Sequence, residues 1–487
     1  MNDYPVLTVT TFLPLVGAAL VFFRGGERLA RWISLVTTLA TLIVSAPLYF
    51  RFAKDSSALQ FVESADWIPT WGVSYGMGVD GISLPFIFLA SLLSVLCVGV
   101  SWTAVRTRVR EFHVALLVAE TAMIGLFAAA NLFLFFVFWE LMVIPVFLLI
   151  GVWGGPRRVY ASVKFLIFTL AGSVLMLVGI IALHKLCGTL DFKALAGASI
   201  ARVHQYWLFG AFLAAFAVKV PMFPVHTWLP DAHTEAPTAG SVILAAILLK
   251  MGAYGFLRVS LPVLPDAVHH FLLPMLVMSA IAIVYGAYVT LVQTDVKRLI
   301  AYSSVSHMGF VTLGIFTLER KGVEGAILQM FNHGILSAAL FLCVGMIYQR
   351  THTREIADYG GVARTAPVYS TLLALFCLAA AGFPGLNSFV GEFLVIGGAF
   401  ETGSWLGAMA IWGVALGTTY LLWLYYRVVM GKQNPKLAGL ALELDARELA
   451  TLAPLALLAV VVGLYPECVL SYLRAPVAAL LATGGAP

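Results

Sequence analysis

Six ionisable residues of this sequence lie inside long apolar runs. They are two glutamates, two lysines and two histidines: Glu140, Lys219, Lys250, His307, His333 and Glu392. A charge at the centre of a membrane-spanning helix costs about 2.5 to 3.5 kcal/mol, so six of them need a common explanation. Burial lowers the pKa of a lysine and a nearby carboxylate raises it, so a Glu–Lys pair with a second lysine gives sites whose protonation changes when one partner moves. The pattern predicts a proton relay.

One of these lysines lies beside a break in its apolar run. The segment FAVKVPMFPVHTWLPDAHTEAP (216–237) holds Lys219, two close prolines and His226. Proline removes a backbone donor and clashes with the preceding turn, so such a break survives in a membrane only where protein or water satisfies the freed groups. We expect the break to let water and backbone carbonyls reach Lys219. Lys219 and Lys250 lie near the middles of consecutive antiparallel spans and are expected to face each other across one hydrated cavity.

Structural roles also fit some of these residues. A single buried glutamate or lysine often belongs to a structural ion pair, and a neutral histidine such as His307, His333 or His226 also serves as a hydrogen-bond partner between helices. Lys164 lies near the end of its span, where it can snorkel, so anchoring fits it as well as proton transfer. Glu120, central in its span, fits either a helix contact or a neighbouring subunit's proton path.

The composition places most of the chain in lipid. Of 487 residues, 61% are hydrophobic and 11% are charged. The formal net charge of +5 is small for this length and does not suggest nucleic-acid binding. The cysteines stand singly, without the spacing of a zinc or iron–sulfur site, so we expect no redox centre in this chain. They are Cys97, Cys187, Cys343, Cys377 and Cys468. The first apolar run continues past Val21 without a cleavage site, which predicts no cleaved signal peptide.

The apolar runs predict an all-α, polytopic membrane protein. A helix needs about 20 apolar residues to cross the bilayer, and on that measure the chain has about 14 transmembrane helices. The predicted spans are 4–23, 29–51, 82–104, 112–130, 131–153, 158–186, 207–228, 238–260, 267–293, 298–317, 323–348, 366–400, 404–430 and 449–473. The longest polar stretches, 52–81 and 187–206, are too short to fold alone, so no soluble domain is expected.

The basic residues of the loops predict the orientation. Loops on one side carry about 17 lysines and arginines, against about 9 on the other, and the positive-inside rule places the richer side in the cytoplasm. Both termini are therefore expected outside, and even-numbered spans begin in the cytoplasm. The basic loops and the absence of a transit peptide favour a bacterial inner membrane.

Two of the predicted spans are broken, and they lie five spans apart. The seventh contains Pro221 and Pro224, and the twelfth contains the stretch AGFPGLN (381–387). An odd offset reverses direction across the bilayer, so spans 4 to 8 and 9 to 13 are predicted to be two inverted five-helix repeats, the arrangement in which broken helices flank an ion path. The predicted divisions are 1–111 (helices 1 to 3), 112–260 (the first repeat), 267–430 (the second, inverted repeat) and 431–487 (a loop and helix 14).

A dinucleotide-binding pattern fails on its context. Residues 76–81 match G-x-G-x-x-G, but they precede a transmembrane helix and no acidic residue follows about 20 positions later. We interpret this segment as a turn. Gly413 and Gly417 form a small-residue pair that indicates close helix packing.

Four segments identify a family resemblance. They are FAVKVPMFPVHTWLPDAHTEAPTAGSVILAAILLKMGAYGFLR (216–258), TDVKRLIAYSSVSHMG (294–309), FNHGILSAALFL (331–342) and GFPGLNSFVGEF (382–393). They resemble the antiporter-like, proton-pumping membrane subunits of respiratory complex I, and the match runs along nearly the whole chain. Two features favour one branch of this family over its sister subunits L and N. Both L and N typically carry lysine at the position of Glu392, and L has a long lateral helix, whereas this sequence ends at Pro487 without one.

The resemblance implies a role for each matching position. Glu140 would modulate Lys219, the central proton carrier, and Lys250 would pass the proton onward. The proton would then move through hydrated His307 and His333 towards Glu392 on the outlet side. His226, in the broken seventh span, would help to connect the charged row.

The resemblance also implies the surroundings of the chain. NADH, FMN, iron–sulfur clusters and quinone would belong to partner subunits, with no cofactor in this chain, and the partners would be other membrane subunits of complex I, especially L and N, together with membrane lipids. Two alternatives share the motifs: a subunit of a multisubunit Na⁺/H⁺ antiporter and a membrane subunit of a hydrogenase complex. A purely structural scaffold would leave the central lysines without a reason.

Overall fold

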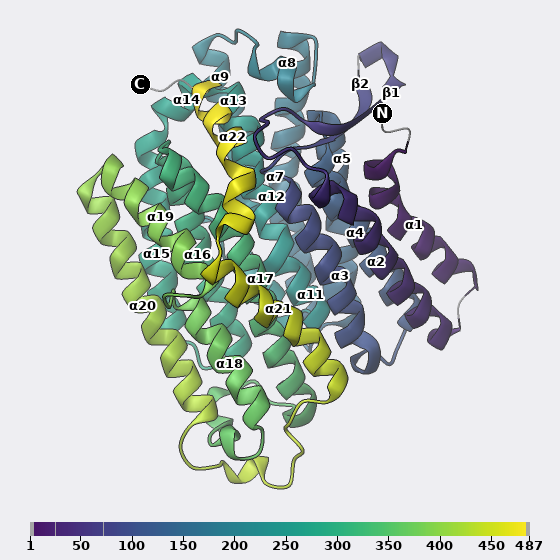
Figure 1. The fold of residues 1–487 in the computed structure, drawn as a ribbon, viewed down its shortest axis with the longest axis vertical. Coiled ribbons are helices and arrows are strands. Elements are labelled where there is room, and N and C mark those ends of the chain that lie inside the picture. The colour runs from purple at the N-terminus through teal and green to yellow at the C-terminus, as the bar shows by residue number, and fades with distance from the viewer. Residues whose placement is uncertain (1–3, 25, 72, 484–487) are drawn as a thin grey trace.

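Long helices running side by side make up most of the molecule (Figure 1). The computed structural model describes residues 4–24, 26–71 and 73–483. Twelve helices within these ranges are long and apolar enough to cross a membrane. The prediction of a helical, polytopic membrane protein is therefore confirmed.

Helices account for most of the described residues. The first three are α1 (Val6–Arg24), α2 (Glu27–Phe50) and α3 (Leu84–Ala104), followed by α4 (Val109–Ala128), α5 (Leu132–Leu141), α6 (Val143–Trp153), α7 (Arg158–Cys187), α8 (Phe192–Ala196), α9 (Arg202–Lys219), α10 (Trp228–Glu235), α11 (Thr238–Ile243), α12 (Leu249–Gly255), α13 (Leu261–Val263), α14 (Pro265–His270), α15 (Leu272–Leu291), α16 (Val296–Phe316), α17 (Arg320–Thr351), α18 (Pro367–Ala380), α19 (Asn387–Thr402), α20 (Ser404–Val429), α21 (Ala446–Leu464) and α22 (Glu467–Thr483). Two π-helical segments, Leu244–Leu248 and Phe256–Ser260, join α11, α12 and α13 into one continuous span.

An antiparallel hairpin interrupts the helical pattern near the N-terminus. Strand β1 (Gln60–Ile68) pairs with β2 (Val73–Val79) inside the polar stretch 52–81, so this stretch adds two strands to a fold that is otherwise helical in its described part. Part of the G-x-G-x-x-G segment lies in β2, and the turn follows that strand. The hairpin is held in place by Glu63, whose carboxylate accepts hydrogen bonds from the backbone N–H groups of Leu7 and Thr8 at 2.7 and 2.9 Å. A carboxylate here also satisfies free donors at the start of α1.

The two predicted spans that are missing from the twelve candidates are the two that the sequence marked as broken. The seventh ends as a regular helix at Lys219, and the chain resumes as α10 at Trp228, so its predicted end was wrong. The twelfth is split between α18 and α19 by residues 381–386, as predicted. Both breaks follow from local chemistry, since proline and glycine interrupt the helical hydrogen-bond ladder.

Some predicted boundaries need correction. The fourteenth span, predicted at 449–473, ends at Leu464, and α22 begins at Glu467 after a kink that contains Pro466. Pro466 has no backbone N–H to donate and restricts the residue before it, which explains the helix end. The ninth span is also shorter than predicted, because α14 is separate from α15.

Helix packing around the two breaks is similar. Helix α7 packs against both α9 and α10, and α17 packs against both α18 and α19. Since α7 and α17 are the sixth and eleventh predicted spans, the likeness fits the five-span offset. The two inverted repeats and the four divisions of the chain stay a prediction.

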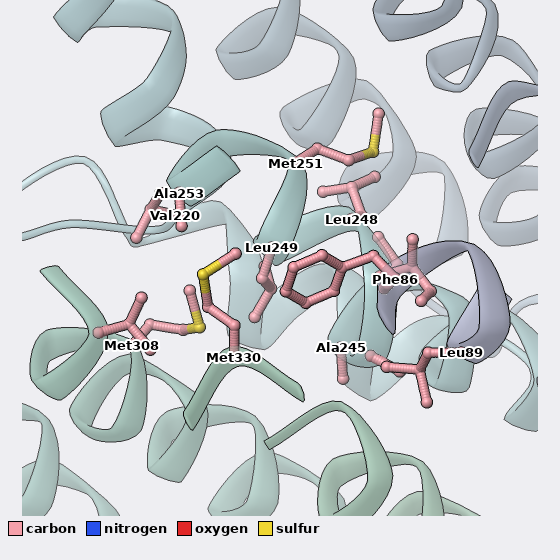
Figure 2. Close-up of a cluster of buried hydrophobic side chains, with 14 of the residues drawn as sticks. Phe86, Leu89, Val220, Ala245, Leu248, Leu249, Met251, Ala253, Met308 and Met330 are labelled. Atoms are coloured by element: carbon pink, nitrogen blue, oxygen red, sulfur yellow. The ribbon is translucent and has the colours of Figure 1, made fainter. Parts of the chain in front are cut away.

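An apolar layer surrounds the span that carries Lys250. Figure 2 shows Leu248, Leu249 and Met251 of this span among side chains from other helices, including Phe86 of α3 and Met330 of α17. Most of the span's residues are fully buried. A charged group in this region therefore depends on the few polar partners that neighbouring helices supply.

Candidate functional site

Lys250 lies at the centre of the site and contacts α17. Its ammonium nitrogen is 2.6 Å from Nδ1 of His333 and 2.7 Å from the carbonyl oxygen of Ala245. Lys250 is completely buried, so these two groups are the hydrogen-bond partners that offset its desolvation. The close approach of the two helices needs Gly334, because a Cβ there would come within 3.0 Å of the Ala246 carbonyl oxygen.

His333 leads to a second histidine across a polar cavity. The ring centres of His333 and His307 are 5.7 Å apart. Both rings line a small cavity with Gln329 and four serines, among other residues, and the serines are Ser303, Ser304, Ser337 and Ser388. Its volume of 10 Å³ is about that of one water-sized sphere, and hydroxyl, amide and imidazole groups supply the partners that a buried water needs.

His307 connects this cavity to Glu392. Nδ1 of His307 is 3.2 Å from Oε1 of Glu392, and Nε2 is 3.3 Å from the hydroxyl oxygen of Tyr420. If Nδ1 carries the proton, it donates to the carboxylate while Nε2 accepts from the tyrosine, which is the pattern for a neutral imidazole. An imidazole held between a carboxylate and a hydroxyl can bind a proton on one nitrogen and release one from the other.

Two further side chains hold Glu392. The amide nitrogen of Gln329 donates to Oε1 of Glu392 at 3.0 Å and to Oγ of Ser388 at 2.7 Å, and the Ser388 hydroxyl lies 3.3 Å from the same carboxylate oxygen. Oε2 of Glu392 faces the break of the twelfth span, where a Cβ on Gly382 would come within 3.0 Å of it. Gly382 has φ +74°, a conformation that glycine adopts without strain.

Lys219 ends α9 and lies on the opposite side of Lys250's helix from α17. Its ammonium nitrogen is 5.0 Å from the centre of the Trp139 ring, and among the described residues it has no hydrogen-bond partner. Glu140 interacts with it electrostatically, but no direct ion pair joins them within the described residues. The expected backbone carbonyls are thus replaced by an aromatic face, which attracts a cation.

The two central lysines belong to adjacent helices but turn to different partners. A Cβ on Gly252 would come within 3.0 Å of the Cβ of Lys219, so α9 and α12 are in contact. The ammonium group of Lys250 nevertheless points to His333 and that of Lys219 to Trp139. The expectation that they face each other does not describe this conformation.

His226 lies apart from the row formed by Lys250, His333, His307 and Glu392. Its ring stacks on Phe223 and meets Tyr285 edge-on, with centre distances of 5.9 and 5.4 Å. His226 interacts electrostatically with Lys164.

Lys164 and Glu120, whose roles the sequence left open, have different surroundings. Lys164 forms an ion pair with Asp231 of α10 at 2.7 Å, and Arg298 approaches the same carboxylate at 3.5 Å. Glu120 is completely buried in α4, and neither carboxylate oxygen has a partner in the part of the chain that the structure describes.

The sequence analysis missed three polar residues of the site: Gln329, Ser388 and Tyr420. Gln329 precedes His333 by four residues and Ser388 precedes Glu392 by four, so each pair shares a helix face and the spacing was a usable signal. Tyr420 carries no such signal, because it is brought to His307 only by the packing of α20. Within the described ranges, no cluster of three or more His, Cys, Asp and Glu residues is arranged to hold a metal ion.

Comparison with known proteins adds a family to this geometry. The sequence pattern of the transmembrane family described as NADH:quinone oxidoreductase/Mrp antiporter matches residues 129–417, which run from the end of α4 into α20. The chain is 46% identical to NADH-quinone oxidoreductase subunit M of Rhodobacter capsulatus, over 98% of this chain and 96% of that protein.

Solved structures share the fold. A chain of respiratory complex I from Thermus thermophilus with bound NADH superimposes with a TM-score of 0.90 at 30% identity, over 98% of this chain and 99% of that one. A chain of the Mrp complex from Dietzia sp. DQ12-45-1b has a TM-score of 0.84 at 23% identity, over 96% of this chain and 52% of that one, and shows the fold alone. The chain therefore belongs to the NADH:quinone oxidoreductase/Mrp antiporter transmembrane family.

Proposed function

We propose that this chain is the proton-translocating, antiporter-like subunit M of an NADH:quinone oxidoreductase, the equivalent of mitochondrial subunit 4. It moves protons from the cytoplasm to the periplasm, driven by electron transfer from NADH to quinone in partner subunits. The chain takes part in an enzyme complex without carrying out redox chemistry itself.

The observation that supports this proposal most strongly is the row of buried groups Lys250, His333, His307 and Glu392. Each member is within hydrogen-bond distance of the next, except for the 5.7 Å step between the two histidine rings, which a polar cavity spans. Titratable groups of this kind, placed in series inside an apolar bundle, are suited to carry a proton. Each of them costs insertion free energy, which a structural role does not require. A structural scaffold has no need of them.

The chemistry follows from the partners of each group. Lys219 keeps its proton while the carboxylate of Glu140 is near and loses it more readily when that carboxylate moves away. A proton that reaches Lys250 passes to Nδ1 of His333, crosses the cavity to His307 and reaches Glu392. The surrounding apolar layer excludes bulk water, so the proton follows the polar groups.

The surroundings of the chain belong to the same proposal. NADH, FMN, iron–sulfur clusters and quinone lie in partner subunits, with no cofactor in this chain. The nearest partners are the sister subunits L and N, together with membrane lipids. The chain lies in the bacterial inner membrane with both termini in the periplasm and binds no nucleic acid.

The alternative is a subunit of a multisubunit Na⁺/H⁺ antiporter or of a membrane-bound hydrogenase complex. These proteins would use the same row of groups, so the row does not exclude them. Sequence identity favours complex I, since the chain is 46% identical to NADH-quinone oxidoreductase subunit M of Rhodobacter capsulatus and 30% identical to the Thermus complex I chain.

The test replaces Lys219 by alanine in the assembled complex. NADH-driven quenching of a pH-sensitive dye in inverted membrane vesicles reports proton pumping, and NADH:quinone electron transfer is measured alongside. Native gels check assembly. Loss of both activities in an assembled complex is expected, because the proton path is coupled to turnover. Unchanged activities would contradict the proposal and direct the work to sodium-stimulated proton exchange and hydrogen-linked activity.

A further inference from the structure

A second polar cavity lies at the N-terminal end of the span that carries Lys250. Its volume is 200 Å³, and its walls come from four places: the end of α6, the link between α10 and α11, the start of α16 and the end of α17. Three charged side chains line it, Glu235, Lys297 and Arg354, and Tyr348 at its rim is 39% exposed. These walls lie in or beside loops whose basic residues predict the cytoplasmic face. We call it the basal cavity.

The basal cavity has fixed walls. The Glu235 carboxylate accepts a hydrogen bond from the backbone N–H of Arg157 at 2.9 Å, and the Lys297 ammonium donates to the Ala236 carbonyl oxygen. Arg354 forms an ion pair with Asp295 at 3.2 Å. A cavity lined by charged groups and opening at a rim of this kind can be filled by water.

His233 lies directly behind this cavity, one residue before the first of its lining residues on α10. It is completely buried, and in the described part of the chain neither ring nitrogen has a hydrogen-bond partner. Its ring stacks on Phe341 of α17 with the ring centres 4.8 Å apart. A buried imidazole loses free energy for each unpaired nitrogen, so both ring nitrogens of His233 are available to water from the cavity or to a titratable neighbour.

The contacts made along α17 show what His233 faces. The cavity touches α17 at Tyr348 and Val344, and the His233 ring touches α17 one turn deeper, at Phe341. His333 lies eight residues beyond Phe341 on the same helix, which is about 12 Å. The ammonium group of Lys250 reaches back along its own span to Ala245, towards the cavity. His233 is close enough to interact electrostatically with Lys250 and with His333.

We propose that His233 carries protons from the basal cavity to Lys250, so that the cavity and this histidine form the uptake side of the relay. The assignment rests on the proposed function and adds a residue and a water-filled chamber to it. The ring takes up a proton on the nitrogen that faces the cavity and releases the proton of its other nitrogen towards Lys250. Water bridges the gap between the ring and the ammonium group. The ring returns to its first tautomer by turning, so one proton moves and none is gained or lost.

Several charged groups face His233 and set its response to pH. Lys297 of α16 and Lys250 of α12 approach it from two sides, and His333 approaches it from α17. On its own helix the carboxylates of Asp231 and Glu235 turn to other partners, Lys164 and the backbone N–H of Arg157. Positive charge on Lys297 and Lys250 disfavours a second proton on the ring, so His233 acts as a neutral imidazole that passes a proton from one nitrogen to the other.

The test replaces His233 by glutamine, which keeps hydrogen-bonding groups but does not carry a proton. In inverted vesicles the cytoplasmic face meets the medium, so the pH of the medium is the pH on the uptake side. NADH-driven pumping and NADH:quinone activity are measured at about pH 6 and about pH 8.5, each relative to wild type at the same pH. We expect a loss of about tenfold at the alkaline pH and of at most about twofold at the acid pH, because a relay without its base depends on the proton concentration.

The matched control is His113→Gln. His113 is also completely buried without a partner for either nitrogen among the described residues, but it lies in α4 beside Arg31. It should retain wild-type rates at both pH values. A loss for His233→Gln that is equal at the two pH values, absent, or matched by the control would overturn the assignment.

Two further variants keep the result decisive. Lys250→Met should lose activity at both pH values. If Lys250→Met and His233→Gln both keep wild-type activity, the proposed function itself is contradicted. If Lys250→Met loses activity and His233→Gln keeps it, only the uptake assignment is contradicted. If His233→Gln does not assemble, Val344→Cys places a thiol in the cavity wall. A charged, membrane-impermeant thiol reagent added to these vesicles should then reduce activity at alkaline pH, and the absence of any reduction would overturn the assignment.

Discussion

The ammonium nitrogen of Lys250 lies 2.6 Å from Nδ1 of His333. This contact joins two transmembrane helices in a region where neither side chain meets bulk water. The second partner of the lysine is the carbonyl oxygen of Ala245, which lies within a π-helical turn of the same span, a feature that is frequent at functional sites. Lys250 is thus held by a partner that can accept its proton.

The two histidines should behave as a unit. His333→Leu and His307→Leu each remove a step that no other group in the row replaces, and we expect each to lower NADH-driven pumping by at least about tenfold, in the range of lost acid–base catalysis. The double variant should be no worse than the poorer single variant, because one missing step already stops the path. Independent, multiplicative losses measured in vesicles would indicate two separate paths.

Glu392 and Gln329 should differ in kind. Glu392→Gln keeps the shape and removes the carboxylate that receives the proton, so pumping should be lost. Gln329→Leu removes a hydrogen bond to that carboxylate at 3.0 Å, and we expect a smaller loss of about threefold to tenfold, the effect of one typical hydrogen bond. Initial rates of dye quenching in assembled complex compare the two, and equal losses would mean that Gln329 carries protons too.

The Trp139 ring should stabilise the charged form of Lys219. The ammonium nitrogen lies 5.0 Å from the ring centre, and a desolvated cation–π contact contributes about 2 kcal/mol. Trp139→Leu should therefore slow coupled turnover by about tenfold to thirtyfold, while Trp139→Phe, which keeps an aromatic face, should recover much of the rate. Trp207→Leu is the control, because this tryptophan is 79% exposed. If leucine and phenylalanine give equal rates, the ring face has no part.

A salt bridge at the predicted cytoplasmic side should matter for stability and not for transport. Arg350 of α17 binds both carboxylate oxygens of Glu448 in α21, at 2.8 and 2.6 Å, and the glutamate is nearly buried. Glu448→Ala removes the carboxylate partner, while the guanidinium keeps its hydrogen bonds to the carbonyl oxygens of Met346, Ala441 and Glu443, and it should destabilise the protein by about 2 kcal/mol. Thermal aggregation of the purified complex should begin at a lower temperature, with turnover per assembled complex unchanged. A loss of turnover at full assembly would place this pair in the mechanism.

Local features of the sequence predicted the breaks and the buried charges. Proline and glycine act within a few residues, so residues 220–227 and 381–386 could be recognised as breaks, and charges stand out against an apolar run. The contacts could not be predicted, because Lys250 meets a residue 83 positions away and Tyr420 reaches His307 over 113 positions. The β1–β2 hairpin was also missed, since its placement depends on Glu63 reaching the start of α1.

The central claim is that protons pass through Lys250. The most direct measurement is the rate of NADH-driven proton pumping, with the rate of NADH oxidation recorded alongside, in inverted vesicles carrying Lys250→Met. The control is Lys185→Met, which changes an exposed lysine at the end of α7. With assembly confirmed on native gels, we predict that Lys250→Met loses pumping and coupled electron transfer together, and that Lys185→Met retains both. Wild-type pumping and electron transfer in assembled Lys250→Met complex would contradict the account.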